Sequence, residues 1–109
     1  MLLAVAGCGG GGPEPRLPPE LAASLAARAD SVASLLAEGD ACGARSEAQE
    51  LRRETIEALN TGRIPAALQE ETVGAGSELV ESIGCGTDAS APPPAAAERL
   101  AERFRELAG

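Results

Sequence analysis

Three cysteines, Cys8, Cys42 and Cys85, are the side chains of this 109-residue sequence best suited to act as nucleophiles, redox groups or soft metal ligands. The sequence has no histidine, which disfavours a catalytic thiol because such a thiol needs a base beside it. A redox-active pair usually takes the form Cys-x-x-Cys, which does not occur here. A zinc site needs about four ligands. With no histidine, and with Cys8 near the N-terminus, only two thiols and some carboxylates could supply them. We therefore expect no metal site and no cofactor. The roles that remain for the three cysteines are disulfide formation and acylation.

Cys42 and Cys85 lie at similar distances from one turn. Each is about 20 residues from the turn centred on residues 62–64. Two antiparallel helices of equal length return to the same end, because each residue adds about 1.5 Å to either helix. The spacing therefore predicts a structural disulfide between Cys42 and Cys85. Such a bond forms outside the reducing cytoplasm, and for a loop of this length it stabilises a fold by about 4 kcal/mol.

Cys8 ends the run Val5-Ala6-Gly7-Cys8, which is followed by Gly9 to Gly12 and Pro13. This run resembles the end of a bacterial lipoprotein signal. The resemblance implies that Cys8 is acylated on its thiol and becomes the mature N-terminus. The Gly/Pro-rich residues that follow would then be a flexible tether to the membrane.

The segment before Cys8 is shorter than a secretory signal, which has a basic start and roughly 7–15 apolar residues. Only Met1 to Ala6 precede Gly7, and none of them is basic. We expect that the true start codon lies further upstream. The alternative is that the motif arose by chance in an Ala- and Gly-rich cytosolic protein, in which Cys8 is a free thiol.

The net charge of −8 disfavours nucleic acid as a partner, because phosphate binding needs clustered cations. It also disfavours polybasic attachment to anionic lipid. No apolar run is long enough to span a bilayer, so membrane binding would depend on two acyl chains at Cys8. All nine basic residues are arginine, and together with the many Ala, Gly and Pro residues this composition resembles that of an actinobacterial protein.

Apolar periodicity predicts four helices, over about 20–38, 40–60, 65–83 and 95–107. In the first two, Gly39 ends one helix and Asp40 caps the next. We expect Arg53 and Glu57 to form an ion pair. The residues expected to face inward are Leu21, Leu25, Val32, Leu35, Leu36, Ala48, Leu51, Thr55, Ile56 and Leu59, and those expected to face outward are Glu50, Arg53, Glu54 and Glu57.

The third predicted helix follows a turn in which Gly62 ends the second helix and Pro65 begins the third. Gly74 and Gly76 lie in its middle, where each costs up to about 1 kcal/mol relative to Ala. Close packing against a neighbouring helix would explain them, and a kink or break is the alternative. The inward stripes of the last two helices are Leu68, Thr72, Ala75, Leu79 and Ile83, then Leu100, Phe104 and Leu107.

The expected fold is all-α: a small antiparallel three-helix bundle, in which the disulfide pins a helical hairpin, plus a C-terminal amphipathic helix. That last helix either packs on the bundle or is held off by a proline linker. The expected segments are a signal remnant (1–7), a tether (8–19), a helical domain (20–85), a Pro-rich linker (86–94) and the C-terminal helix (95–109).

Residues 20–85 resemble small helical domains of exported actinobacterial proteins. The motifs that carry the resemblance are Gly39-Asp40, Cys42, Gly62-Arg63-Ile64-Pro65, Leu68-Gln69-Glu70 and Ile83-Gly84-Cys85. The resemblance implies export and a disulfide-pinned helical fold, with no activity to transfer.

The function that we expect is that of a lipid-anchored extracytoplasmic protein with a binding or structural role, without catalysis. It would bind through an apolar groove or through its C-terminal amphipathic helix. Its expected partners are membrane lipid, through acylated Cys8, and an unknown protein. The predicted helices place most carboxylates on solvated faces, and Ser77, Ser82 and Ser90 have no histidine for a triad. One alternative is a cytosolic helical interaction module without an anchor, and another is an accessory lipoprotein that delivers a substrate to an enzyme.

Overall fold

The computed structural model describes residues 14–85 and 91–109. These residues form four helices and no strand: α2 (Pro19–Ala37), α3 (Ala41–Asn60), α4 (Ala66–Ser82) and α5 (Pro94–Leu107). The helix bounds lie within one or two residues of those expected from periodicity. The prediction of an all-α fold is confirmed.

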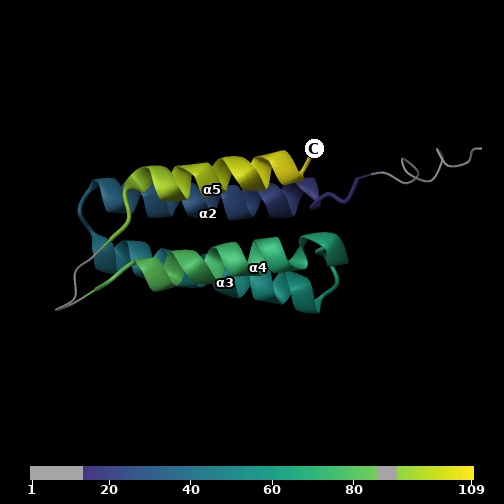
Figure 1. Cartoon of the computed structure of the whole chain (residues 1–109), viewed down its shortest axis with the longest axis horizontal. Helices are drawn as coiled ribbons and strands as arrows, with labels where there is room; N and C mark the ends of the chain where they lie inside the picture. The colour runs from purple at the N-terminus through teal and green to yellow at the C-terminus, as the bar shows by residue number, and fades with distance from the viewer. Residues whose placement is uncertain (1–13, 86–90) are drawn as a thin grey trace, which may run out of the picture.

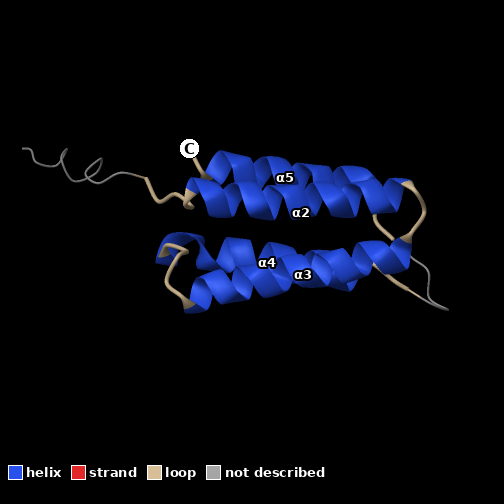
Figure 2. Ribbon diagram, turned by 180° about the vertical axis from the view of Figure 1, so that it is seen from behind, coloured by secondary structure: helices blue, strands red, loops and turns tan. Residues whose placement is uncertain are grey.

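The helices form two antiparallel pairs (Figures 1 and 2). α2 and α5 lie side by side in one pair, and α3 and α4 form a hairpin in the other. α2 also packs against α3, so it is the helix that joins the two pairs. The turn between α2 and α3 and the end of α4 lie at one end of the bundle, and the α3–α4 turn lies at the other.

The core is built largely from small and aliphatic side chains. α2 contacts two helices and therefore buries a wide face, which is rich in alanine because small side chains let helix backbones approach closely. Phe104 is the sole aromatic residue of the sequence and is fully buried. The buried residues of α2 are Leu21, Ala22, Leu25, Ala26, Ala29, Val32 and Ala33, and those of α5 are Ala97, Ala101, Phe104 and Leu107.

The C-terminal helix packs on the bundle, which is one of the two arrangements that the sequence left open. α5 buries Phe104 and Leu107 along α2. The segment before α2 is also packed, since the Leu17 side chain is buried and its backbone N–H donates to the Leu107 carbonyl oxygen at 2.8 Å. The structure here differs from the expectation of a tether that reaches residue 19, because Leu17 belongs to the core.

Local signals end and begin the helices as expected. Gly39 and Gly62 both have positive φ, 81° and 75°, the left-handed conformation that glycine adopts without strain. The Asp40 carboxylate accepts a hydrogen bond from the Gly43 backbone N–H at 2.9 Å and caps α3. Pro65 precedes α4 as its N-cap residue instead of starting it.

The two glycines of α4 have different environments in a continuous helix. Gly76 is buried, and a Cβ atom added there would lie 3.3 Å from the Arg52 Cα atom of α3. Close packing therefore explains Gly76. A Cβ atom added at Gly74 would meet nothing within 4 Å, so no contact among the described residues requires glycine there.

Three side-chain expectations for α3 are wrong. Ile56 is 37% exposed instead of buried. Arg53 pairs with Glu50 and not with Glu57, because the i−3 carboxylate is also within reach on a helix surface. Glu54 points toward α2 instead of solvent. The differences at Ile56 and Glu54 have one cause. Periodicity alone does not specify which face of α3 is covered by α2.

Candidate functional site

The cysteine pair lies at the end of the bundle opposite the C-terminus (Figure 1). Cys42 is in the first turn of α3, and Cys85 follows the end of α4. Their Cα atoms are 4.9 Å apart, and the two residues are 43 positions apart in sequence. The prediction that an equal-armed hairpin brings these cysteines together is confirmed.

The geometry suits a disulfide, because bridged cysteines have Cα atoms about 4.4–6.8 Å apart. Both residues are exposed. Cys8, the expected acylation site, lies outside the described residues.

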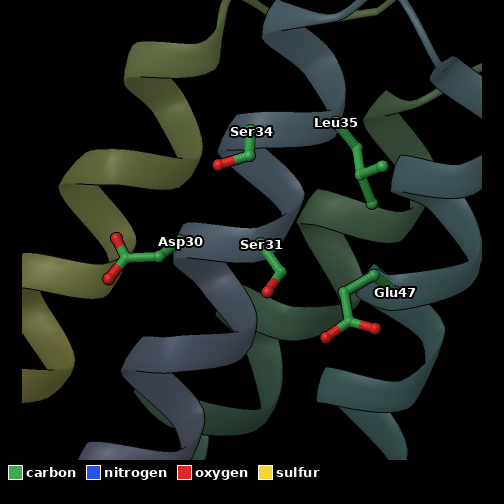
Figure 3. Close-up of a pocket in the computed structure, with 5 residues that line it drawn as sticks. All are labelled: Asp30, Ser31, Ser34, Leu35 and Glu47. Carbon is green, nitrogen blue, oxygen red and sulfur yellow. The ribbon is translucent and has the colours of Figure 1, made fainter.

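An open hollow lies between α2 and α3 (Figure 3). Asp30, Ser31, Ser34 and Leu35 of α2 line it, together with Glu47 of α3. Asp30 points toward α5 and pairs there with Arg105. Since Glu47 pairs with Arg28, both carboxylates at this hollow already have cationic partners.

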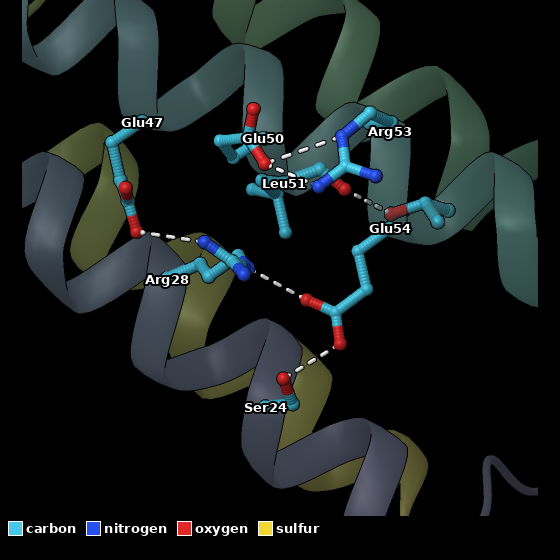
Figure 4. Close-up of polar contacts among 8 residues, drawn as sticks. Ser24, Arg28, Glu47, Glu50, Leu51, Arg53 and Glu54 are labelled. Atoms are coloured by element: carbon cyan, nitrogen blue, oxygen red, sulfur yellow. Dashed lines mark hydrogen bonds and ion pairs between the residues drawn. The ribbon is translucent and has the colours of Figure 1, made fainter.

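A polar cluster joins α2 to α3 next to this hollow (Figure 4). The Arg28 Nε–H group donates to Glu54 Oε1 at 2.7 Å, and the Ser24 hydroxyl donates to Glu54 Oε2 at 2.6 Å. Arg28 Nη1 also lies 3.4 Å from Glu47 Oε2. Both oxygens of Glu54 are therefore engaged, and the cluster links two helices.

The electrostatics of the cluster follow from these contacts. The hydrogen bond to Glu54 raises the pKa of Arg28 above its ordinary value, although partial burial acts in the opposite direction. On the neighbouring turn, the Arg53 guanidinium lowers the pKa of Glu50. These shifts favour the charged forms of Arg28 and Glu50, so both groups are held in ion pairs.

Sequence reasoning missed this cluster, although the sequence contained a signal. Arg28 is the sole cation within the 19 residues of α2, and it lies four residues after Ser24 on the same face. Glu47 and Glu54 are seven residues apart and share a face of α3. A cation on one helix and two carboxylates on the next indicate a contact between the two faces.

Two further ion pairs fix α5. Arg103 pairs with Glu71 of α4, and Arg105 pairs with Asp30 of α2. The hydrogen bond from Arg103 lowers the pKa of Glu71. α5 therefore bridges the two helix pairs at the surface, in addition to its buried contact with α2.

Within residues 14–85 and 91–109, no group of three or more Asp, Glu, Cys or His side chains could hold a metal ion. Every buried side-chain nitrogen or oxygen in this part of the chain has a hydrogen-bond partner. No helix in the same ranges is long and apolar enough to cross a membrane. The cysteine pair is therefore the arrangement in the described residues with the most distinct chemistry.

No protein-family model, curated protein or solved structure matches this chain.

Proposed function

We propose that this protein is exported and anchored by lipid on Cys8, and that it acts outside the cytoplasm by binding or spacing other molecules without catalysis. The observation that carries the proposal is the cysteine pair. Cys42 and Cys85 are exposed and at disulfide distance, an arrangement that is stable as a bond in an oxidising compartment. The Val5-Ala6-Gly7-Cys8 run supports the same location through different chemistry.

The proposed disulfide pins the α3–α4 hairpin at its open end. The opposite end is closed covalently by the turn between Asn60 and Ala66. With both ends joined, the hairpin has less conformational freedom to gain on unfolding. This matters for a core with one aromatic residue, because small cores supply little net stability.

The proposed anchor determines how the bundle stands on a membrane. Leu17 is held in the core, and Cys8 is nine residues before it, a span of at most about 32 Å when fully extended. The end that carries the C-terminus would therefore face the bilayer, and the cysteine pair would lie at the far end.

The C-terminal helix is a poor candidate for the binding element. Its Phe104 and Leu107 side chains are buried against α2, so they serve the core. A binding surface of this protein therefore lies on the exposed faces of the helices.

Metabolic labelling with a clickable fatty acid tests the anchor. The gene is expressed from its own locus, as the wild type and as the Cys8→Ala and Cys42→Ala variants. We expect label on the wild type and on Cys42→Ala, and none on Cys8→Ala. An unlabelled wild type found in the cytosol would overturn the proposal and favour a cytosolic interaction module.

A further inference from the structure

We infer that the outer face of the α3–α4 hairpin binds a second copy of this chain, forming a two-fold dimer in which Ile56 of each copy packs over Gly74 of the other. This inference does not depend on the lipid anchor. It depends on three features of one face: an exposed apolar side chain, a glycine without an internal role, and charges that complement each other between two copies.

The apolar part of this face lies along the groove between α3 and α4. Among the residues that the structure describes, Ile56 is the one large hydrophobic side chain that is exposed. Leu59 is three residues after Ile56 on α3 and is half-buried. It lines a hollow together with Gln69, Glu70, Val73 and Gly74 of α4. A single exposed isoleucine is ordinary, but here Leu59, less than one turn further along α3, lines the neighbouring hollow at Gly74.

Gly74 supplies the second feature. It lies inside a helix, where glycine costs up to about 1 kcal/mol relative to Ala. Unlike Gly76, it has open space where its Cβ atom would be. A glycine on a partly exposed helix surface, as Gly74 is, lets another chain approach the backbone closely, and the hollow beside Gly74 is where such a chain would fit.

The third feature is a division of charge between the two helices. On this face α3 presents Arg45 and Arg52, and α4 presents Glu70 and Glu81. None of these four takes part in an ion pair within the described residues. In a two-fold dimer the same patch meets itself, so α3 of one copy lies over α4 of the other and opposite charges face each other.

The heights along the hairpin specify which residues meet. Gly76 lies beside Arg52, and α3 and α4 are antiparallel, so Ile56 is level with Thr72. Gly74 is two residues away from that level, or about 3 Å along the helix. A two-fold axis parallel to the helices keeps these heights, and it therefore brings Ile56 of one copy to Gly74 of the other.

The same matching of heights between α3 and α4 brings opposite charges of the two copies together. Arg45 is level with Ile83, two residues from Glu81, so Arg45 of one copy meets Glu81 of the other. The axis also directs both N-terminal segments to the same side, which is compatible with two copies on one membrane.

Sedimentation equilibrium of the full chain, with the Cys42–Cys85 bond formed and Cys8 replaced by Ser, tests the dimer. The Cys8→Ser change prevents cross-linking between copies through that thiol. We expect a concentration-dependent dimer whose dissociation constant rises at least about tenfold in Ile56→Asp. Ala27→Asp is the matched control, because it adds the same charge at an exposed position of α2 and should leave the dimer intact.

A charge exchange tests the register. Arg45→Glu should weaken the dimer, and the double variant Arg45→Glu/Glu81→Arg should restore it. Circular dichroism verifies that each variant is folded. A wild type that stays monomeric at every concentration, equal effects of Ile56→Asp and Ala27→Asp, or no rescue by the double exchange would each overturn the inference.

Discussion

The Leu17 backbone N–H donates to the Leu107 carbonyl oxygen at 2.8 Å, which joins the segment before α2 to the last residue of α5. The Leu17 side chain is buried at the same place. This contact closes the α2–α5 pair at the end where the chain enters the bundle, so a segment that reads as a tether in the sequence contributes to the core.

Replacing Leu17 by alanine should lower the free energy of unfolding by about 2–4 kcal/mol, because it removes a fully buried leucine. Glu14→Ala, in the same segment but exposed, should change it by less than about 0.5 kcal/mol. Urea unfolding followed by circular dichroism measures both. Equal effects of the two substitutions would show that residue 17 is not part of the core.

Removing the cysteine pair with Cys42→Ala and Cys85→Ala together should lower the free energy of unfolding by up to about 4 kcal/mol, since the bond closes a long loop. A reductant should destabilise the wild type and leave the double variant unchanged. Thermal unfolding with and without reductant makes the comparison, and a wild type indifferent to reductant would contradict a structural bond.

The two glycines of α4 should respond oppositely to alanine. Gly74→Ala should stabilise the monomer by up to about 1 kcal/mol, because the new methyl group meets nothing and the helix gains propensity. Gly76→Ala should show no such gain and should destabilise the fold, since the methyl group would press on the backbone of Arg52 at 3.3 Å. Urea unfolding at low protein concentration tests this, and a stabilising Gly76→Ala would refute the close packing.

The contact between Arg28 and Glu54 should show a coupling free energy of about 0.5–1.5 kcal/mol in a double-mutant cycle with Arg28→Met and Glu54→Gln. The pair is partly buried between two helices. The exposed pair of Glu50 and Arg53 is the control and should couple more weakly, because water screens it. Equal coupling in both cycles would mean that the cluster contributes nothing specific to the α2–α3 contact.

Much of the fold could be predicted from local signals. Gly39, Asp40 and Gly62 act on their own turns, so their roles follow from residue type and position alone. The meeting of Cys42 and Cys85 follows from two helices of equal length around one turn. These features need no knowledge of how the helix pairs pack.

The features that could not be predicted depend on which helix covers which face. Ile56 fits the apolar stripe of α3 by periodicity, yet α2 and α4 cover other sides of that helix and leave it exposed. A glutamate side chain on a helix usually faces solvent. Glu54 faces α2 instead, because Arg28 lies opposite. Leu17 lies four residues before Leu21, in step with the apolar stripe of α2. The two prolines that follow it mark the start of the helix, so the sequence assigns Leu17 to the tether instead of the core.

The protein is proposed to mature where thiols oxidise, and the oxidation state of its cysteines in the cell tests this proposal without any change to the chain. Cells are quenched with acid, and the thiols that are free at that point are alkylated with one reagent. The protein is then reduced, and the newly released thiols are alkylated with a second reagent of different mass. Mass spectrometry then reads each cysteine peptide. We expect Cys42 and Cys85 to carry the second label only, because both are oxidised before reduction. Recovery of both as free thiols in the native protein would contradict it.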